Sequence, residues 1–348
     1  MSQFYTLKIK EVIKETANAV SLIFNIPANL KSEFTFEAGQ YITLKTMING
    51  EEVRRAYSLC SSPKSNEIKV AIKSVENGKF SVHATTQLNA GDSIDVSAPE
   101  GKFILNPAKD NNYVGFAAGS GITPVLSMIK AVLESETNAT FTLVYGNRTI
   151  AETIFYNELN ELHKEYLGRF NLNYIFSREN NEHGSFGRID GAHVNYFTKN
   201  IYKDIKFDQA FLCGPEEMIN TVSTKLQENG FSEAAISYEL FTASIDEEAV
   251  AKVKDGESEV KVVLDDEETT FNMQQTDTLL AASLRHKIDA PYSCQGGVCS
   301  SCIAKVTEGK AVMVKNQILT DAELEEGFVL TCQAHPTTPT LTLDFDDV

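Results

Sequence analysis

The chain of 348 residues is too long for one ordinary domain, and its 42% hydrophobic content is enough for two or three separate cores. Its formal net charge of −17 argues against nucleic acid and against an anionic membrane as partners. No run approaches the roughly 18 apolar residues of a membrane span, and the N-terminal segment lacks the apolar centre of a secretion signal. We therefore expect a cytoplasmic protein.

Residues 1–106 alternate apolar and polar side chains in short runs, as antiparallel strands do. Turn-forming pairs such as Asn49-Gly50 and Asn77-Gly78 separate these runs. We predict an antiparallel β-barrel, with strands over Phe4–Ile9, Val20–Ile26, Tyr41–Leu44, Ile68–Ile72 and Ser93–Val96.

One predicted strand of this barrel carries Arg55, Tyr57 and Ser58. Side chains 55 and 57 share a face of a strand. A guanidinium group suits a phosphate, and a tyrosine ring can lie on a flat aromatic cofactor. The plain interpretation is a surface strand, because surface strands often carry such residues.

A second candidate is the turn formed by Gly78, Lys79, Phe80 and Ser81, which opens a short helical stretch. Free N–H groups at the start of a helix bind phosphate or pyrophosphate. The alternative is an ordinary turn capped by Ser81, which these residues alone favour.

Residues 107–242 alternate strand and helix patterns, so we predict a doubly wound α/β domain with a parallel sheet. The predicted strands are Tyr113–Ala117, Thr140–Tyr145, Phe170–Phe176 and Gln209–Leu212. The predicted helices are Val125–Leu133, Ala151–Glu165, Ala192–Lys199 and Pro215–Glu228.

Nucleotides bind such sheets where the first strand enters its helix. Gly119, Gly121 and Thr123 stand at this place, where the glycines admit a close approach of the backbone and Thr123 can bond a pyrophosphate. The full G-x-G-x-x-G fingerprint is absent, which weakens the motif.

The segment Cys213, Gly214 and Pro215 ends the last predicted strand, again on the ligand-binding edge. Cys213 could be a buried structural thiol, but this position favours a place beside a nicotinamide.

We interpret the charged, alanine-rich residues 243–257 as an interdomain linker. Residues 258–348 then read as strand, strand, helix, cysteine loop and strand, which predicts a small β-grasp domain.

The cysteines of this last domain follow the spacing C-x4-C-x2-C at Cys294, Cys299 and Cys302, with Cys332 downstream. Plant-type 2Fe–2S clusters have this ligand pattern. A structural zinc site usually pairs its cysteines in two short knuckles, and disulfides are disfavoured in a reducing compartment. Zinc and disulfides are therefore the weaker alternatives.

Together these motifs resemble the ferredoxin–NADP reductase superfamily, in the branch with a plant-type ferredoxin at the C-terminus. The domain order is most similar to that of the reductase components of phenylacetyl-CoA epoxidase complexes, and reductases of aromatic-ring oxygenases and alkane or fatty-acid hydroxylases share parts of it.

The resemblance implies a role for each motif. Arg55, Tyr57 and Ser58 would contact the phosphate, ring and N5 of FAD, and Gly78–Ser81 would hold its pyrophosphate. Gly119, Gly121, Thr123 and Cys213–Pro215 would frame the nicotinamide nucleotide. Phe241 would shield the other flavin face, unless it is a plain core residue.

Ser177 and Arg178 follow the third strand of the nucleotide domain, where an arginine accommodates the 2′-phosphate of NADPH. We therefore expect NADPH, although Glu179 leaves NADH open.

The implied function is an electron-transfer enzyme that passes electrons from NADPH through FAD and a 2Fe–2S cluster to an oxygenase or monooxygenase component, with phenylacetyl-CoA epoxidase as the first candidate. The alternatives are an NADH-dependent reductase of another hydroxylase, a self-contained flavin oxidoreductase and a zinc-stabilised scaffold. Because residues 258–348 hold fifteen Asp or Glu against six Lys or Arg, we expect the acceptor to offer a basic docking face.

Overall fold

The computed structural model describes residues 3–242 and 244–348. The chain divides into two compact units, Gln3–Glu239 and Leu240–Val348, which are treated separately below. Among the described residues, no helix is both long and apolar enough to cross a bilayer.

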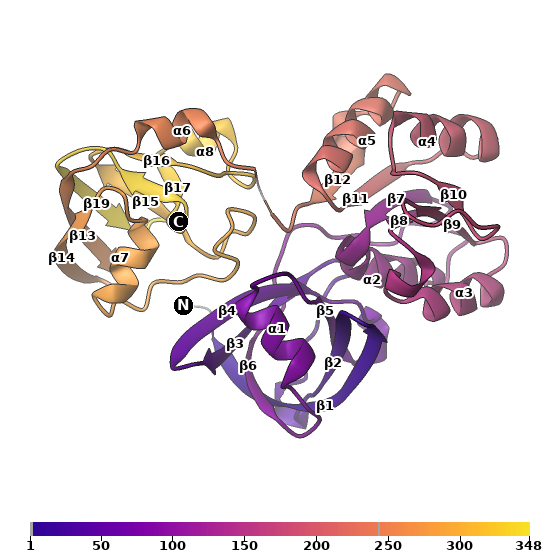
Figure 1. Ribbon diagram of the computed structural model, residues 1–348, viewed down its shortest axis with the longest axis horizontal. Coiled ribbons are helices and arrows are strands. Elements are labelled where there is room, and N and C mark those ends of the chain that lie inside the picture. Colours follow the sequence, from indigo (N-terminus) through magenta and orange to yellow (C-terminus); the bar gives the residue numbers. More distant parts are fainter. Residues whose placement is uncertain (1–2, 243) are drawn as a thin grey trace. The chain divides into compact units, whose positions relative to one another are not determined.

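The first half of the Gln3–Glu239 unit is an antiparallel sheet with the strand order β4-β3-β6-β1-β2-β5 (Figure 1). The strands are β1 (Phe4–Thr16), β2 (Ala19–Asn25), β3 (Tyr41–Ile48), β4 (Glu51–Ser58), β5 (Ile68–Lys73) and β6 (Ser93–Ser97). Leu59, just beyond β4, pairs with Val70 of β5 and closes the sheet into a barrel. A closed barrel leaves no unpaired edge.

Helix α1 (Lys79–Thr86) follows β5 and turns its buried side, Phe80 and Ala84, into the barrel core. That core is made of leucine, isoleucine, valine and phenylalanine side chains, which the alternating pattern had placed on one face of each strand.

The second half of this unit is a parallel sheet with the order β10-β9-β8-β7-β11-β12. Its strands are β7 (Asn112–Ala118), β8 (Thr140–Asn147), β9 (Phe170–Phe176), β10 (Ser185–Phe186), β11 (Gln209–Cys213) and β12 (Ile236–Glu239). Helices α2 (Ile122–Leu133) and α3 (Tyr156–Glu165) cover one face, while α4 (Gly191–Asn195) and α5 (Glu216–Glu228) cover the other (Figure 1). The carboxyl ends of β7 and β11 therefore meet at one edge, since these strands pair directly.

The helix that we predicted over Ala151–Glu165 is wrong in its first part. A 3₁₀ turn occupies Ile150–Glu152, and α3 begins only at Tyr156. The break comes at Phe155, whose φ of 61° lies in the left-handed region that a bulky side chain rarely adopts.

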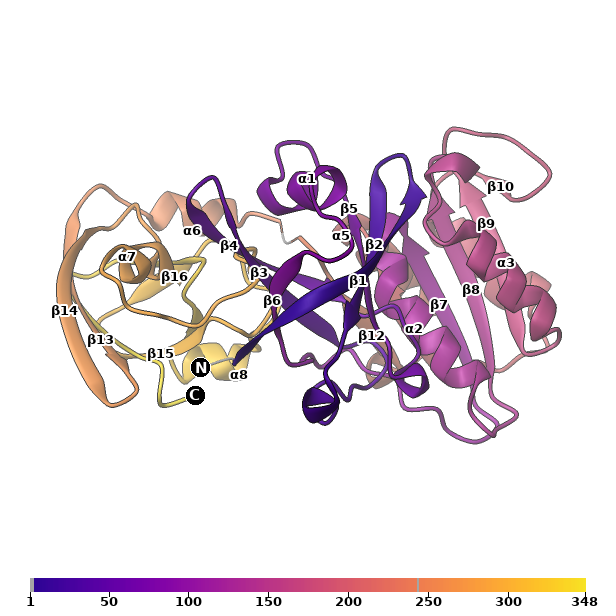
Figure 2. The same cartoon turned by 90° about the horizontal axis from the view of Figure 1, so that it is seen from below.

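The Leu240–Val348 unit contains a mixed sheet in the order β14-β13-β19-β15-β17, with α7 packed on it (Figure 2). The strands are β13 (Glu257–Leu264), β14 (Glu267–Gln274), β15 (Ile303–Glu308), β17 (Phe328–Leu330) and β19 (Thr340–Asp344). A small second sheet pairs β16 (Ala311–Met313) with β18 (Ala334–Pro336), and the helices are α7 (Leu279–Arg285) and α8 (Asp321–Glu325). With these two units, the predicted fold class is confirmed.

Helix α6 (Glu247–Lys252) lies inside the stretch that we predicted to be a linker. Asp246 caps it by accepting a hydrogen bond from the Ala249 N–H at 3.0 Å, and the Asp246 N–H donates to the Val314 carbonyl at 2.8 Å. Ala249 is buried. Most of the described part of the predicted linker is thus ordered structure within the second unit.

Candidate functional site

Three side chains from distant parts of the chain meet at the carboxyl edge of the parallel sheet. The Ser58 hydroxyl, at the end of β4, donates a hydrogen bond of 3.0 Å to the Glu239 carboxylate at the end of β12. Glu239 is the direct register partner of Cys213 on the neighbouring strand β11. The barrel and the parallel sheet are therefore joined at Ser58, Glu239 and Cys213.

Burial changes the acidity of two of these groups. It raises the pKa of Glu239 to about 7, against the opposing effect of the Ser58 hydrogen bond. Burial also raises the pKa of the Cys213 thiol well above its ordinary value, and the nearby Glu239 adds to the shift. Near neutral pH this edge can hold a protonated carboxyl group beside a neutral thiol.

Sequence reasoning missed Glu239, because β12 is only four residues long and lies 181 residues from Ser58. Glu239 links the predicted residues Ser58 and Cys213, whose roles beside flavin and nicotinamide stay predictions.

The other predicted residues of β4 are Arg55 and Tyr57. The Arg55 guanidinium donates to the carbonyl of Arg54 at 2.6 Å and keeps part of its surface exposed. The Tyr57 ring lies 5.5 Å from the Phe80 ring, in a tilted arrangement. Because Phe80 is fixed in the barrel core, it positions the ring of Tyr57.

The turn Gly78–Ser81 lies at the start of α1, as predicted, and Gly78 is its N-cap. A Cβ atom at Gly78 would lie 2.3 Å from the Ser81 Oγ and 2.6 Å from a Val75 methyl group, so only glycine fits. The Lys79 side chain pairs with Glu51, and that of Phe80 is buried. The Gly78 N–H already donates to the Val75 carbonyl at 3.0 Å. The N–H groups of residues 79–81 at the start of the helix, rather than those two side chains, are available to a pyrophosphate.

The predicted nucleotide loop forms a 3₁₀ turn over Gly119–Gly121. A Cβ atom at Gly121 would lie 2.1 Å from the Cys213 carbonyl oxygen, so the loop lies directly against the end of β11. Thr123 turns its hydroxyl back to the Ser120 carbonyl at 3.0 Å and is buried. Thr123 therefore shapes the loop rather than pointing its hydroxyl outward.

Gly214 and Pro215 complete this edge. A Cβ atom at Gly214 would lie 2.7 Å from the Met218 terminal methyl group and 3.1 Å from the Ala118 Cβ. Pro215 is the N-cap of helix α5, whose first residue is Glu216. The two turns thus pack against each other with no room for larger side chains.

Lys73 is a further residue that the sequence patterns did not single out. It ends β5, and its ammonium group lies 3.8 Å from the position that a Cβ of Gly119 would occupy. The pKa of Lys73 is lowered, mainly because the side chain is partly buried. A cation of the barrel therefore stands over the nucleotide loop, where a phosphate group would pair with it.

Ser177 and Arg178 extend β9 alongside the end of β8. Their N–H groups donate to the carbonyls of Asn147 and Arg148, both at 2.9 Å, so the backbones of Arg178 and Arg148 are neighbours. The Glu179 carboxylate accepts the Ile150 N–H at 2.9 Å. Glu179 is thus engaged with the protein backbone, while two arginines stand on adjacent strand ends.

Phe241 belongs to the second compact unit, where its side chain is 39% exposed. Its predicted position on the second face of the flavin stays a prediction.

The four predicted cysteine ligands come together in the Leu240–Val348 unit. The Sγ atoms of Cys294 and Cys299 are 3.1 Å apart, and Cys332 hydrogen-bonds with both Cys294 and Cys302. The Gly296 N–H donates to the Cys294 sulfur at 3.3 Å. Hydrogen bonds from Cys299, Cys332 and this N–H lower the pKa of Cys294, so the loop favours a thiolate.

Contacts between neighbouring thiols link all four cysteines: Cys294 contacts Cys299 and Cys332, and Cys332 also contacts Cys302. A tetrahedral zinc needs all four sulfurs around one point, whereas each iron of a 2Fe–2S cluster takes two thiolates. The structure brings together the four thiols that a 2Fe–2S cluster needs, two for each iron.

The cysteine loop is held from two sides. The Gln333 side chain donates to the Gln295 carbonyl at 3.0 Å, and the Gln317 N–H donates to the Gly297 carbonyl at 3.2 Å. Gln295 and Gly297 both have positive φ angles, 53° and 74°, which curve the loop tightly.

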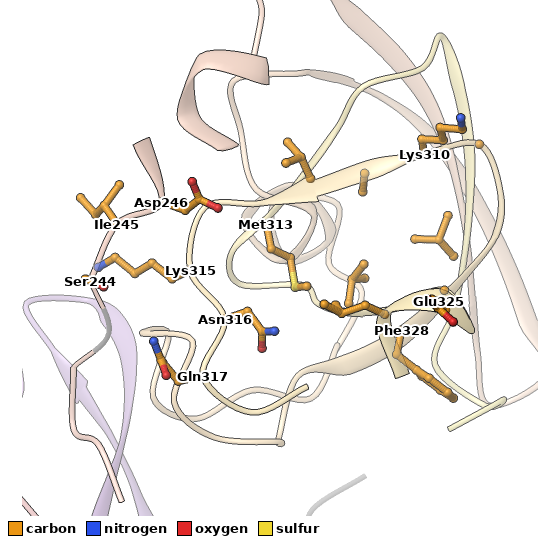
Figure 3. Close-up of a pocket in the computed structure, with 17 residues that line it drawn as sticks. Ser244, Ile245, Asp246, Lys310, Met313, Lys315, Asn316, Gln317, Glu325 and Phe328 are labelled. Carbon is orange, nitrogen blue, oxygen red and sulfur yellow. The ribbon is translucent and has the colours of Figure 1, made fainter. Parts of the chain in front are cut away.

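A hollow of about 810 Å³ adjoins this loop and is lined by Gln317 (Figure 3). Its lining mixes apolar side chains, such as Met313 and Phe328, with polar ones, such as Lys315 and Asn316. The hollow is thus linked to the cysteine loop through Gln317, whose N–H donates to the Gly297 carbonyl.

Three family profiles match the chain in succession. Residues 6–104 match the oxidoreductase FAD-binding domain, residues 116–224 the oxidoreductase NAD-binding domain, and residues 262–337 the 2Fe-2S iron-sulfur cluster binding domain.

Curated relatives match over the whole length. One component of the 1,2-phenylacetyl-CoA epoxidase of Escherichia coli is 38% identical, with 99% of each chain covered. The ferredoxin reductase component of 3-ketosteroid-9-alpha-monooxygenase from Rhodococcus rhodochrous is 31% identical, over 99% of this chain and 97% of the relative. Among solved structures, phthalate dioxygenase reductase has a TM-score of 0.66 at 24% identity, with 98% of each chain covered.

The raised pKa of Glu239 generates a first prediction. A carboxyl group whose pKa is about 7 in the folded chain and about 4.3 in the unfolded chain binds more protons when folded. Its contribution to stability is complete below the unfolded value and is lost as the pH rises through about 7. As the pH is raised from about 5 to about 8, the melting temperature of the flavin-free wild type should therefore fall relative to that of Glu239→Gln. Parallel melting curves across this range would contradict the assignment.

Proposed function

Because the chain belongs to the three-domain reductases of the ferredoxin–NADP reductase superfamily, with an FAD domain, a nucleotide domain and a C-terminal 2Fe–2S domain, we propose that it transfers electrons from NADPH to a phenylacetyl-CoA epoxidase-type oxygenase. The observation that carries the proposal is the joint presence of the Ser58–Glu239–Cys213 edge and four thiols that contact one another. When bound, the flavin accepts a hydride as a two-electron unit and releases single electrons, which the cluster requires.

The residues of the first unit would position the two reactants. Arg55 and the N–H groups of the Gly78–Ser81 turn would hold the phosphates of FAD, with Tyr57 against its ring. Gly119 would let the pyrophosphate of NADPH approach the backbone, with the Lys73 ammonium group as its counter-charge, while Gly121 lets the loop pack against the end of β11. Ser58, Glu239 and Cys213 would line the position where nicotinamide meets flavin and exclude water from it.

The residues of the second unit would hold the cluster. Cys294 and Cys299 would bind one iron, in line with the 3.1 Å contact of their sulfurs, and Cys302 and Cys332, which also contact each other, would bind the other. The N–H of Gly296 would remain as a hydrogen-bond donor to the Cys294 thiolate, which raises the reduction potential of such clusters.

Two arginines support NADPH as the coenzyme. Arg178 and Arg148 stand on adjacent strand ends, where the 2′-phosphate of the coenzyme would lie. Glu179, the group that could have accepted the 2′-OH of NADH, already accepts the Ile150 N–H. Arg148 also pairs with Glu152 at 3.8 Å, so Arg178 is the stronger candidate.

The acceptor would dock over the cysteine loop and the adjoining hollow. Helix α8, with Asp321, Glu323 and Glu325, contributes to this region, since Leu324 and Glu325 line the hollow. The full-length similarity to the epoxidase component favours an oxygenase of that type, and the acidic surface favours a basic docking face on it.

The first prediction here separates the two units. Cys299→Ser should abolish the visible absorption of the cluster and the reduction of one-electron acceptors, but leave the reduction of FAD by NADPH intact. The reason is that the flavin and nucleotide residues belong to the other unit. Cys60→Ser, at a buried thiol of the first unit, is the control and should keep the cluster. Loss of flavin reduction in a folded Cys299→Ser protein would oppose the modular mechanism.

The second prediction concerns the coenzyme. Arg178→Ala should raise the KM for NADPH about tenfold, as expected for the loss of one charge-assisted hydrogen bond, and should hardly change the KM for NADH. Lys203→Ala, at an exposed lysine of the same unit, should change neither value. An equal effect of Arg178→Ala on both coenzymes would exclude a role in binding the 2′-phosphate.

The third prediction concerns docking. At an ionic strength near 0.5 M the Debye length falls to roughly 4 Å, so electron transfer to the oxygenase should slow severalfold. Reduction of the flavin by NADPH should change much less. Stopped-flow measurements of both steps across a salt series test this, and a salt-independent second step would show that charge does not guide docking.

A further inference from the structure

One face of helix α2 is bonded along its length to the segment that follows the flavin-contacting strand β4. The Ser127 hydroxyl donates to the Ser61 carbonyl at 2.8 Å, and the Lys130 ammonium donates to the Cys60 carbonyl at 3.0 Å. One turn further, Glu134 accepts from the Ser62 hydroxyl. Residues 127, 130 and 134 share a face of the helix, so these contacts form a continuous strip, called here the α2 seam.

The seam connects the two halves of the proposed reaction site. Cys60 lies two residues after Ser58, and α2 begins directly after Gly121 of the nucleotide loop. A helix is a stiff element, and hydrogen bonds to carbonyl groups fix both distance and direction. The seam therefore fixes where the end of β4 lies relative to the nucleotide loop.

A buried charged cluster reinforces the seam at Lys130. The Glu158 carboxylate of α3 pairs with Lys130 at 2.5 Å and with Lys69 of β5 at 3.5 Å. Lys69 also pairs with Glu15 of β1 at 3.6 Å. The side chains of Lys69 and Lys130 are only 10% and 12% exposed, so neither ammonium group has water as its main partner.

The charges in this cluster support one another. Burial would raise the pKa of Glu158, but Lys130 and Lys69 outweigh it and hold that pKa below its ordinary value. Purely apolar packing between the two domains would tolerate sliding. The three linked ion pairs of this cluster favour a single register, because any shift leaves a charge without its partner.

Phe155 provides an independent sign of constraint at the same place. It adopts the left-handed conformation, φ 61°, while its ring is buried beneath the Lys69 ammonium at 4.9 Å from the ring centroid. An unfavourable backbone conformation of this kind persists only where the surroundings impose it. Here it starts α3 at Tyr156, so that Glu158 reaches both lysines.

We propose that Lys130 and Ser127 are positioning residues for hydride transfer, which hold the flavin-contacting strand in register with the nucleotide loop. This inference rests on the function proposed above. Neither side chain reaches the reacting atoms. They act through Cys60 and Ser61 on Ser58, and a displacement of about 1 Å between reactants can cost up to a hundredfold in rate.

The test is single-turnover reduction of bound FAD by NADPH in the full-length holoprotein. Lys130→Met keeps the aliphatic stem but removes the charge. It should slow flavin reduction about tenfold at saturating NADPH, with the KM for NADPH and the FAD content close to wild type. Lys130→Arg should restore most of the rate, since a guanidinium can still donate to Cys60 and pair with Glu158. Lys164→Met, at an exposed lysine of α3, should behave as wild type.

A wild-type rate of flavin reduction in Lys130→Met overturns the proposal. A slower rate also overturns it if the KM for NADPH rises equally and Lys130→Arg does not restore the rate. If Lys130→Met does not fold, Ser127→Ala takes its place, because it removes only a single hydrogen bond. It should likewise lower the rate of flavin reduction and leave the KM for NADPH unchanged. Failure of the proposed function is recognised separately, because wild-type flavin would then not be reduced by NADPH or NADH.

Discussion

The hydrogen bond between Ser58 and Glu239 is the interaction on which the arrangement of the first unit depends. It joins the end of a barrel strand to the end of the last strand of the parallel sheet, at 3.0 Å. At the same edge, Gly121 and Gly214 let two backbone turns pack without side chains between them. The end of barrel strand β4, a buried thiol and a carboxyl group of raised pKa are thereby brought to one edge, although they lie far apart in the chain.

The two units solve different physical problems. The first must hold two flat reactants in register, and it uses rigid means: glycine turns, the α2 seam and buried ion pairs. The second must stabilise a cluster while remaining open to a partner. Its cysteine loop is tied by Gln333 and Gln317 from the protein side, and acidic runs stay on its surface. In that unit Asp346 accepts the N–H groups of Asp265 and Asp266, so some of these acids also organise the fold.

Local patterns predicted most of the fold and much of the candidate site. The strand Phe170–Phe176 and the convergence of the four cysteines follow from periodicity and spacing within short segments. Glu239 could not be found in this way, because its significance arises from a pairing across 181 residues. The break at Phe155 was equally hidden, since a helical pattern continues through it and only tertiary contacts impose a positive φ. Helix α6 did carry a readable signal, the cap Asp246 ahead of two glutamates, but its charged composition favoured a linker.

The order found in α6 has a consequence for how the chain could be divided or redesigned. Between Glu239, the last residue of β12, and the helix cap Asp246 there are only six residues. A fully extended segment of that length spans at most roughly 20 Å. A tether this short keeps a covalently attached module at an effective concentration in the millimolar range or above, provided that the geometry permits contact. Expressed as two separate polypeptides, the units would have to find each other by diffusion, and electron flow would become dependent on protein concentration.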